Sequence, residues 1–227
     1  MQANMVLDGM STQPLMAEFP AEQGAIWSFI RPLERGASVL LLVLLSPFMI
    51  LAAGAIAMLS RRSPLVAHRR IGQFGSPFWT LKFRTMWGAA AGEGRVGLIE
   101  FIVDERGPES KRFADPRVSS AFARFCRQFS IDELPQLVNV ARGEMSLVGP
   151  RPLTEGELKK HYGTHAAETL RVKPGITGLW QVTGRSRLSF ERRRELDLFL
   201  VRNCSPRLYF TILMRTIPAV LKGKDGW

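Results

Sequence analysis

Two adjacent carboxylates, Asp132 and Glu133, are the strongest candidates for chemistry in this sequence. Ser130 and Glu133 have the S-x-x-E spacing of a helix capping box. Pro135 suits only a first helical turn, so the helix begins at Ser130 or shifts to the residue before that proline, and Gly143 is a natural stop. Either start places both carboxylates at the N-terminal end of a short helix.

Carboxylates in that position have several chemical uses. The helix dipole and the free N–H groups keep a carboxylate ionised, and they also attract phosphate. Two adjacent carboxylates suit Mg²⁺, which usually binds one or two carboxylates together with substrate phosphates. An ionised aspartate can attack phosphorus and form an acyl phosphate. Spacing alone leaves open a simpler interpretation, in which Asp132 and Glu133 only cap the helix.

Several basic residues are candidates for contacting a phosphorylated substrate. In Gly149-Pro150-Arg151-Pro152, two prolines fix the backbone around one arginine, and a rigidly held guanidinium is a good bidentate phosphate clamp. Lys82 and Arg84 are two residues apart, so on a strand they point to the same face. The alternative is that this segment is a structural turn whose arginine pairs with an acid, and that the other basic residues are solvated surface charges. The full set of candidates is Lys82, Arg84, Arg127, Arg151 and Arg185.

A long apolar segment, Gly36–Ser60, is the first element that must help to position these residues. It has 25 residues without a charge, which is typical of a membrane helix. Pro47 removes a backbone hydrogen bond near its middle, and Ser46 can bond to a freed carbonyl and support a bend. Arginines flank both ends, which favours a cytoplasmic location for both. We therefore predict a helix broken at Ser46-Pro47 that enters one leaflet and returns; a kinked spanning helix is the alternative.

Charge is distributed unevenly along the 227 residues, whose formal net charge is +11 at neutral pH. Residues 1–60 contain two arginines and four acidic residues, net −2, so residues 61–227 carry the remaining +13. This suggests an anionic partner, namely nucleic acid, phospholipid headgroups or a phosphorylated substrate. Two cysteines exclude a disulfide scaffold, and with three histidines they do not suggest a structural zinc site.

The fold class that we predict is α/β: a small mixed α/β body with an N-terminal re-entrant membrane helix and amphipathic membrane-surface helices. We divide the chain into a flexible tail at residues 1–30, the re-entrant membrane helix at 31–62 and a cytosolic, membrane-associated body at 63–227. The apolar segment at Pro206–Leu221, with basic residues at intervals, predicts a helix that lies either on the membrane surface or on the core of the body. We also predict strands at Pro77–Met86 and Thr177–Val182, helices at Ser119–Gln128, Leu153–His161 and Ser189–Arg202, and a flexible connector at Gly88–Gly97.

Eight short motifs occur in a fixed order along roughly residues 31–221. They are Ser46-Pro47, HRRIG (68–72), LKFRTM (81–86), DPRV (115–118), SIDELPQL (130–137), RGEMSLVGPRP (142–152), VKPGITGLWQVTGR (172–185) and LDLFLVRN (196–203). In this order they resemble the bacterial sugar transferase family, the monotopic phosphoglycosyl transferases that start exopolysaccharide or O-antigen assembly. The chain length, GLWQV and TIPAV (216–220) are most similar to the galactosyl-phosphate transferases of succinoglycan-type exopolysaccharide synthesis.

The resemblance implies a mechanism. The aspartate that matches Asp132 attacks the β-phosphate of a UDP-sugar, UMP leaves, and the phosphosugar then passes from the enzyme to undecaprenyl phosphate. Glu133 matches the residue that holds Mg²⁺, and Ser46-Pro47 matches the break in the family's membrane helix. Basic positions expected near the phosphates or the nucleotide are matched by Lys82, Arg127, Arg151 and Arg185.

Other expectations concern the substrate and the setting. The resemblance implies galactose or glucose as the sugar and the cytoplasmic face of the bacterial inner membrane as the location. A homodimer is one arrangement to consider. We expect no nucleic-acid partner, because no reader motif accompanies the basic charge and the long apolar segment is out of place in such a protein. The alternative function is a non-catalytic membrane scaffold of a glycan assembly complex.

A few positions depart from the family's usual pattern. Arg31 and Glu34 stand where the family usually has Lys-Arg and then Asp before the apolar segment, and Cys204 replaces a usual tryptophan. The Asp132-Glu133 pair is intact.

Overall fold

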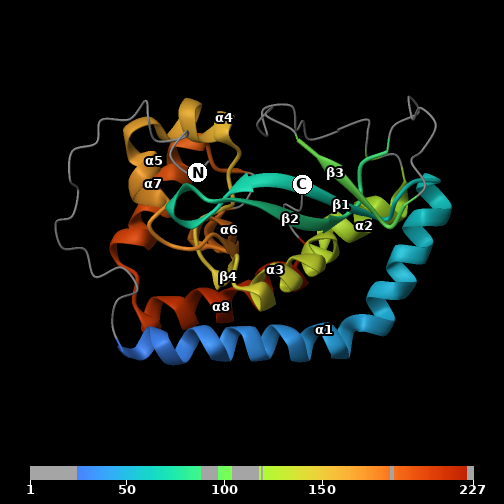
Figure 1. The fold of residues 1–227 in the computed structure, drawn as a ribbon, viewed down its shortest axis with the longest axis horizontal. Coiled ribbons are helices and arrows are strands. Elements are labelled where there is room, and N and C mark those ends of the chain that lie inside the picture. Colours follow the sequence, from blue (N-terminus) through green and yellow to red (C-terminus); the bar gives the residue numbers. More distant parts are fainter. Residues whose placement is uncertain (1–24, 88–96, 104–117, 119, 185–186, 224–227) are drawn as a thin grey trace.

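The structure is a computed structural model that describes residues 25–87, 97–103, 118, 120–184 and 187–223. A long N-terminal helix, α1, runs along one side of the molecule, and the sheets and the shorter helices lie to the other side of it (Figure 1). The arrangement confirms the expected mixture of helix and sheet with one long apolar helix near the N-terminus.

Helix α1 covers Ala25–Ser60 and includes two prolines, Pro32 and Pro47. Because Pro47 has no N–H, the carbonyl of Val43 loses its usual donor, and the Ser46 hydroxyl donates to that carbonyl at 2.8 Å. The predicted role of Ser46 is therefore confirmed. The chain stays helical through Ser46-Pro47, so the helix bends rather than breaks, and the bend is visible in Figure 1.

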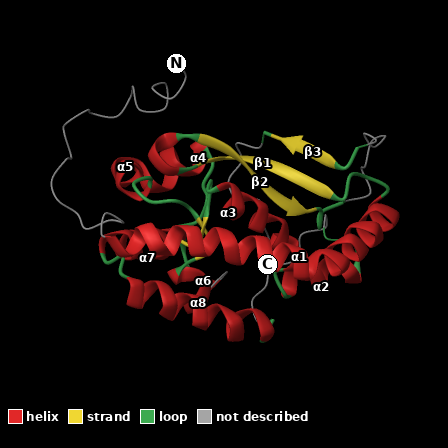
Figure 2. Ribbon diagram, turned by 60° about the horizontal axis from the view of Figure 1, so that its bottom comes forward, coloured by secondary structure: helices red, strands yellow, loops and turns green. Residues whose placement is uncertain are grey.

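Two small sheets lie in the body (Figure 2). The first has the order β2-β1-β3, with β1 antiparallel to β2 and parallel to β3. The second pairs β4 with β5 in parallel. The bounds are β1 Leu65–Ile71, β2 Pro77–Phe83, β3 Ile99–Ile102, β4 Ser146–Val148 and β5 Gly175–Thr177. The strand predicted at Pro77–Met86 is confirmed as β2, whereas the other strands lie outside the predicted ranges except for the end of β5.

Helices account for most of the remaining described chain. They are α2 Ala121–Gln128, η4 Ile131–Gln136, α3 Leu137–Arg142, α4 Glu155–Glu157, η5 Leu158–Tyr162, η6 Gly163–His165, α5 Ala166–Thr169, α6 Leu179–Thr183, α7 Phe190–Arg202 and α8 Pro206–Leu221, together with the short η2 Gln73–Gly75 between β1 and β2. The helices predicted at Ser119–Gln128, Ser189–Arg202 and Pro206–Leu221 are confirmed. The predicted helix at Leu153–His161 is present as α4 and the irregular η5.

The strand predicted at Thr177–Val182 is wrong. Only Thr177 belongs to β5, and the chain then turns at Gly178 into helix α6. Trp180 of α6 is almost completely buried, 1% exposed, so packing of this side chain overrides the strand propensity of a short apolar segment.

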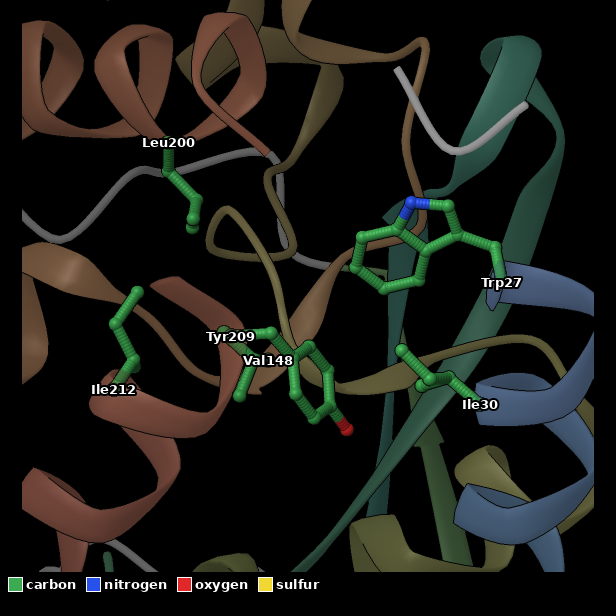
Figure 3. Close-up of a cluster of buried hydrophobic side chains, with 6 residues drawn as sticks. All are labelled: Trp27, Ile30, Val148, Leu200, Tyr209 and Ile212. Carbon is green, nitrogen blue, oxygen red and sulfur yellow. The ribbon is translucent and has the colours of Figure 1, made fainter. Parts of the chain in front are cut away.

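The first turns of α1 are anchored in the body. Trp27 and Ile30 pack against Tyr209 and Ile212 of α8, together with Val148 and Leu200 (Figure 3). The ring of Tyr209 lies edge-on to Trp27, with 5.9 Å between ring centroids. Helical structure begins at Ala25, before residue 30, where we predicted that the flexible tail ends. The contacts that hold these first turns come from residues distant in sequence, so local patterns did not predict them. The connector predicted at residues 88–97 lies almost wholly outside the described residues.

Candidate active site

Asp132 and Glu133 lie in the first turn of η4, a short 3₁₀ helix that leads into α3. The expected location at the start of a helical segment is therefore confirmed, and Gly143 ends α3 with a φ of 78°. The predicted capping box is wrong. Ser130 has a φ of 55°, in the left-handed region, and its side chain makes no capping hydrogen bond. A residue that caps a helix through its side chain usually has an extended backbone, and the turn into η4 does not allow that conformation at Ser130.

The Glu133 side chain instead binds Lys82 of β2. The Lys82 Nζ atom lies 2.6 Å from Glu133 Oε1, and the two side chains are 24% and 20% exposed. The pair is half-buried, so both charges remain within reach of solvent and of a ligand. The sequence predicted both residues as site residues, and the structure brings them together across 51 positions of chain.

Asp132 lies close to α2. Burial and the nearby Asp132 carboxylate raise the pKa of the Cys126 thiol to about 11, so Cys126 stays protonated and has no nucleophilic role at neutral pH. The next residue, Arg127, is buried, and its guanidinium lies 3.5 Å from the Thr85 hydroxyl just beyond β2. Lys82, near the end of β2, is therefore the cation in direct contact with Glu133, while Arg127 of α2 contacts the segment that follows β2.

Arg84 has a different environment. Its side chain is 5% exposed, donates to the Ser63 carbonyl at 2.7 Å and pairs with Glu100 of β3 at 2.5 Å. These contacts tie the β1–β2–β3 sheet to the end of α1, which is the arrangement of a structural ion pair. The predicted site residue Arg185 lies outside the described residues.

Arg151 belongs to a second polar cluster. Its guanidinium carbon lies 5.8 Å from the centroid of Trp180, and that of Arg193 lies 4.9 Å from the same ring. Burial alone would raise the pKa of Glu157, but Arg151 and the backbone N–H of Thr154 hold it below its ordinary value. Arg151 is thus electrostatically coupled to an acid, as the structural alternative predicted, while it stays partly exposed.

The second cluster contains residues that sequence reasoning missed. Asp197 is fully buried, and Tyr162 donates to its Oδ2 atom at 2.8 Å. Burial raises the pKa of Asp197 to about 7 despite the opposing effects of the Tyr162 hydrogen bond and of Arg151. The missed signal was periodicity: Asp197 shares one helix face with Arg193, Leu200 and Val201, and all three are buried.

A cavity of about 230 Å³ begins beside the carboxylates. Glu133 and Ser130 line one part of it, and the rest of the wall comes from α3, both strands of the second sheet, α6 and α8. Its lining is largely apolar: Phe129, Leu134, Leu137, Leu147, Ile176, Trp180, Val182, Leu213, Ala219 and Val220 with five polar residues. Trp180 lines this cavity and also a much smaller one beside Arg151 and Arg193.

The two carboxylates fit a hard divalent cation in their chemistry. Both are oxygen donors, they are adjacent in one turn, and both are partly exposed beside the cavity. Among the described residues no group of three or more potential metal ligands occurs. Mg²⁺ held here would accordingly need further oxygens from substrate phosphate or water, which is its usual arrangement with phosphorylated substrates.

Helix α1 is long and apolar enough to cross a membrane, and only 11% of its most apolar window is buried. Large apolar side chains of the helix, such as Leu44 and Leu51, are exposed. A core helix of a water-soluble protein would bury most of such residues. Helix α8 also exposes large apolar side chains, namely Phe210, Met214, Ile217 and Leu221.

Paired carboxylates beside Lys82, an apolar cavity next to them and an exposed apolar helix are the features of a membrane-associated enzyme with a charged site. Comparison with known families agrees with this class. Residues 27–223 match the family described as "Bacterial sugar transferase", and the chain belongs to that family.

Its relatives include proteins of polysaccharide synthesis. The chain is 40% identical to the "Exopolysaccharide production protein ExoY" of Sinorhizobium fredii, over 92% of this chain and 94% of the relative. It is 41% identical to the "UDP-galactose-lipid carrier transferase" of Erwinia amylovora, over 84% of this chain but 39% of that longer protein. It is 36% identical to the "Undecaprenyl-phosphate galactose phosphotransferase" of Salmonella typhimurium, over 83% of this chain and 39% of the relative.

Proposed function

We propose that the protein transfers a hexose-1-phosphate, from UDP-galactose or UDP-glucose, to undecaprenyl phosphate and releases UMP, as the first step of exopolysaccharide assembly. The observation that carries the proposal is the half-buried Lys82–Glu133 pair beside Asp132 at the mouth of an apolar cavity. Family membership identifies the chain as a sugar transferase. The names of its relatives support a nucleotide-sugar donor and a lipid phosphate acceptor.

In the first half-reaction a carboxylate oxygen of Asp132 attacks the β-phosphorus of the UDP-sugar. The bond between that phosphorus and the bridging oxygen breaks, and UMP leaves with the oxygen. In the second half-reaction a phosphate oxygen of undecaprenyl phosphate attacks the same phosphorus, and the bond to Asp132 breaks. The products are undecaprenyl diphosphate-sugar and the regenerated carboxylate, so no oxidant or net proton is needed.

The surrounding cations suit this chemistry. In this proposal Lys82, which contacts Glu133, and Arg127, which contacts Thr85 beyond β2, offset negative charge on the transferring phosphoryl group. Asp132 and Glu133 are the residues that would hold Mg²⁺, which supplies neutralisation of phosphate charge when bound. Arg151, whose guanidinium carbon lies 5.8 Å from the centroid of Trp180, contacts the nucleotide or a phosphate in this proposal.

We further propose that α1 is re-entrant and that the body lies on the cytoplasmic face of the inner membrane. The two halves of α1 both contact the body: Trp27 and Ile30 pack against α8, and Ala52 and Ile56 pack in the cluster of Phe83. A straight membrane-spanning helix would separate its ends by the thickness of the bilayer, so shared contacts of both halves favour entry into one leaflet.

The orientation of α1 can be tested with cysteine probes. Arg31→Cys and Arg62→Cys, each in a Cys204→Ser background, flank the apolar segment of the helix. We expect both cysteines to react with an impermeant thiol reagent only after the cytoplasmic face is opened. Reaction of the two positions from opposite sides of the membrane would establish a spanning helix and contradict the proposal.

The reaction is tested by assaying UMP release with purified protein, Mg²⁺ and undecaprenyl phosphate over a panel of UDP-sugars, with galactose and glucose first. We expect one UDP-hexose to support release and to give a lipid-linked diphosphate sugar. A protein that folds and enters membranes but releases UMP from no member of the panel would instead be the non-catalytic scaffold.

A further inference from the structure

The apolar cavity beside Glu133 has a clear amphiphilic layout. Its charged end is Glu133, which Lys82 contacts, whereas α3, β5, α6 and α8 supply apolar walls. Three of the polar side chains in the wall have hydrogen-bond partners within the protein: the Thr177 and Thr216 hydroxyls lie 2.8 Å apart, and the Gln181 amide nitrogen donates to the Ile176 carbonyl at 2.9 Å. The interior therefore offers mainly hydrocarbon contacts to a ligand whose head lies at the carboxylates.

Helix α8 connects this cavity to the exposed apolar surface. One of its faces lines the cavity with Leu213, Thr216, Ala219 and Val220. Its other face exposes Phe210, Met214, Ile217 and Leu221, and Tyr209 of the same helix packs against Trp27 of α1. A single helix thus separates an exposed apolar surface from an apolar cavity that has Glu133 in its lining.

We propose that this cavity binds the isoprene units of the lipid acceptor that adjoin its phosphate. The proposal rests on the proposed function, because it takes a polyprenyl phosphate to be the acceptor. A volume of about 230 Å³ is below the ~300 Å³ at which pockets for drug-sized ligands begin. It accommodates only the first part of a polyprenyl chain, and the remainder stays in the bilayer.

The assignment predicts which half-reaction depends on the cavity. Donor chemistry needs Asp132 and the surrounding cations, whereas productive placement of the acceptor phosphate needs the adjoining hydrocarbon to enter between α6 and α8. Filling the cavity should weaken acceptor use and spare exchange of labelled UMP into UDP-sugar, which requires no lipid. Apolar contact thereby selects a lipid phosphate over water-soluble phosphates.

The test compares two phenylalanine substitutions on α8. Ala219→Phe fills the cavity, and Ile217→Phe puts the same side chain on the exposed face of the same helix. With undecaprenyl phosphate we expect Ala219→Phe to raise the KM for the acceptor about tenfold or more, with UMP exchange retained. We expect Ile217→Phe to change neither quantity more than about twofold. An unchanged acceptor KM in Ala219→Phe, or a raised KM for the UDP-sugar instead, would overturn the proposal.

Two further arms make the outcome decisive. A short acceptor with two isoprene units should show the same penalty in Ala219→Phe, and loss of the penalty would move the binding site away from the phosphate-proximal units. If Ala219→Phe does not fold, a polyprenyl phosphate with a photoreactive group on its first isoprene unit is applied to the unaltered protein. Photolabel within residues 176–182 or 213–220 supports binding in the cavity, and photolabel confined to α1 refutes it.

Absence of UMP release by the unaltered protein from every UDP-hexose would instead contradict the proposed function.

Discussion

Two charged clusters border Trp180 and differ in their access to solvent. Glu133 and Lys82 form a partly exposed pair beside a cavity, whereas Asp197 and Tyr162 form a hydrogen-bonded pair that is almost completely buried. A reacting group must meet its substrate, so the first pair suits chemistry. A sealed pair cannot meet a substrate, and its hydrogen bond and charges fix neighbouring elements instead. The contrast separates residues that act on the substrate from residues that hold the site in shape.

Removal of divalent cations tests the exposed cluster with the largest expected effect. Chelation should abolish UMP release, because the transferring phosphate then lacks its main charge neutralisation, while the melting temperature stays unchanged. Activity and thermal unfolding are measured before and after chelation, and added Mg²⁺ should restore turnover. A loss of thermal stability on chelation would show a structural metal and contradict this division of roles.

Glu133→Gln separates charge from shape in the same cluster. The amide keeps the size of the side chain but removes the charge that faces Lys82, so we expect turnover to fall by ~10²-fold or more with folding intact. Steady-state UMP release at saturating Mg²⁺ measures the effect, and circular dichroism controls for folding. Activity within twofold of the unaltered protein would reduce the Lys82–Glu133 pair to a surface ion pair.

A substitution in the buried Asp197–Tyr162 cluster should lower the stability of the protein. Asp197→Ala leaves the Tyr162 hydroxyl without its acceptor and two arginines without a nearby carboxylate, which should lower the free energy of unfolding by ~3 kcal/mol. Denaturant unfolding of the purified protein in one detergent measures the change. The matched exposed substitution Glu195→Gln, which breaks an ion pair with Arg192, should cost less than ~1 kcal/mol. Equal effects at the two positions would remove the distinction.

The same buried acid should also make the stability depend on pH. Burial raises the pKa of Asp197 to about 7 from an unfolded value of 3.8, so the folded state favours the protonated acid. The resulting stability is fully present below about pH 4 and is lost as the pH rises to about 7, by at most ~1.4 kcal/mol per pH unit. In Asp197→Asn this contribution to the pH dependence of unfolding should vanish. An identical pH profile in the variant and the unaltered protein would show that Asp197 does not titrate in this range.

Local patterns in the sequence predicted some elements well. Helices α7 and α8 begin where Ser189 and Ser205 cap them, and both caps accept a backbone N–H as expected for N-cap serines. The apolar segment and Ser46-Pro47 likewise predicted α1 and the hydrogen bond that supports its bend. These features depend on residues a few positions apart, which a sequence displays directly.

Features that depend on distant contacts were harder to predict. Lys82 and Glu133 were both candidates, but their pairing depends on how β2 packs against η4. Asp197 escaped notice because its partners Tyr162 and Arg151 come from other segments. Glu34, a departure from the usual family pattern, accepts hydrogen bonds from Ser146 and Tyr209 and so ties α1 to β4 and α8. None of these contacts follows from local spacing.

The central claim is that Asp132 carries the phosphosugar between the two substrates. The most direct measurement incubates the protein with Mg²⁺ and a labelled UDP-hexose in the absence of lipid, followed by mass-spectrometric mapping of the modified peptide. We predict a phosphohexose adduct on Asp132 that undecaprenyl phosphate discharges and that Asp132→Asn does not form. Full turnover by Asp132→Asn, or an adduct on another residue, would contradict the account.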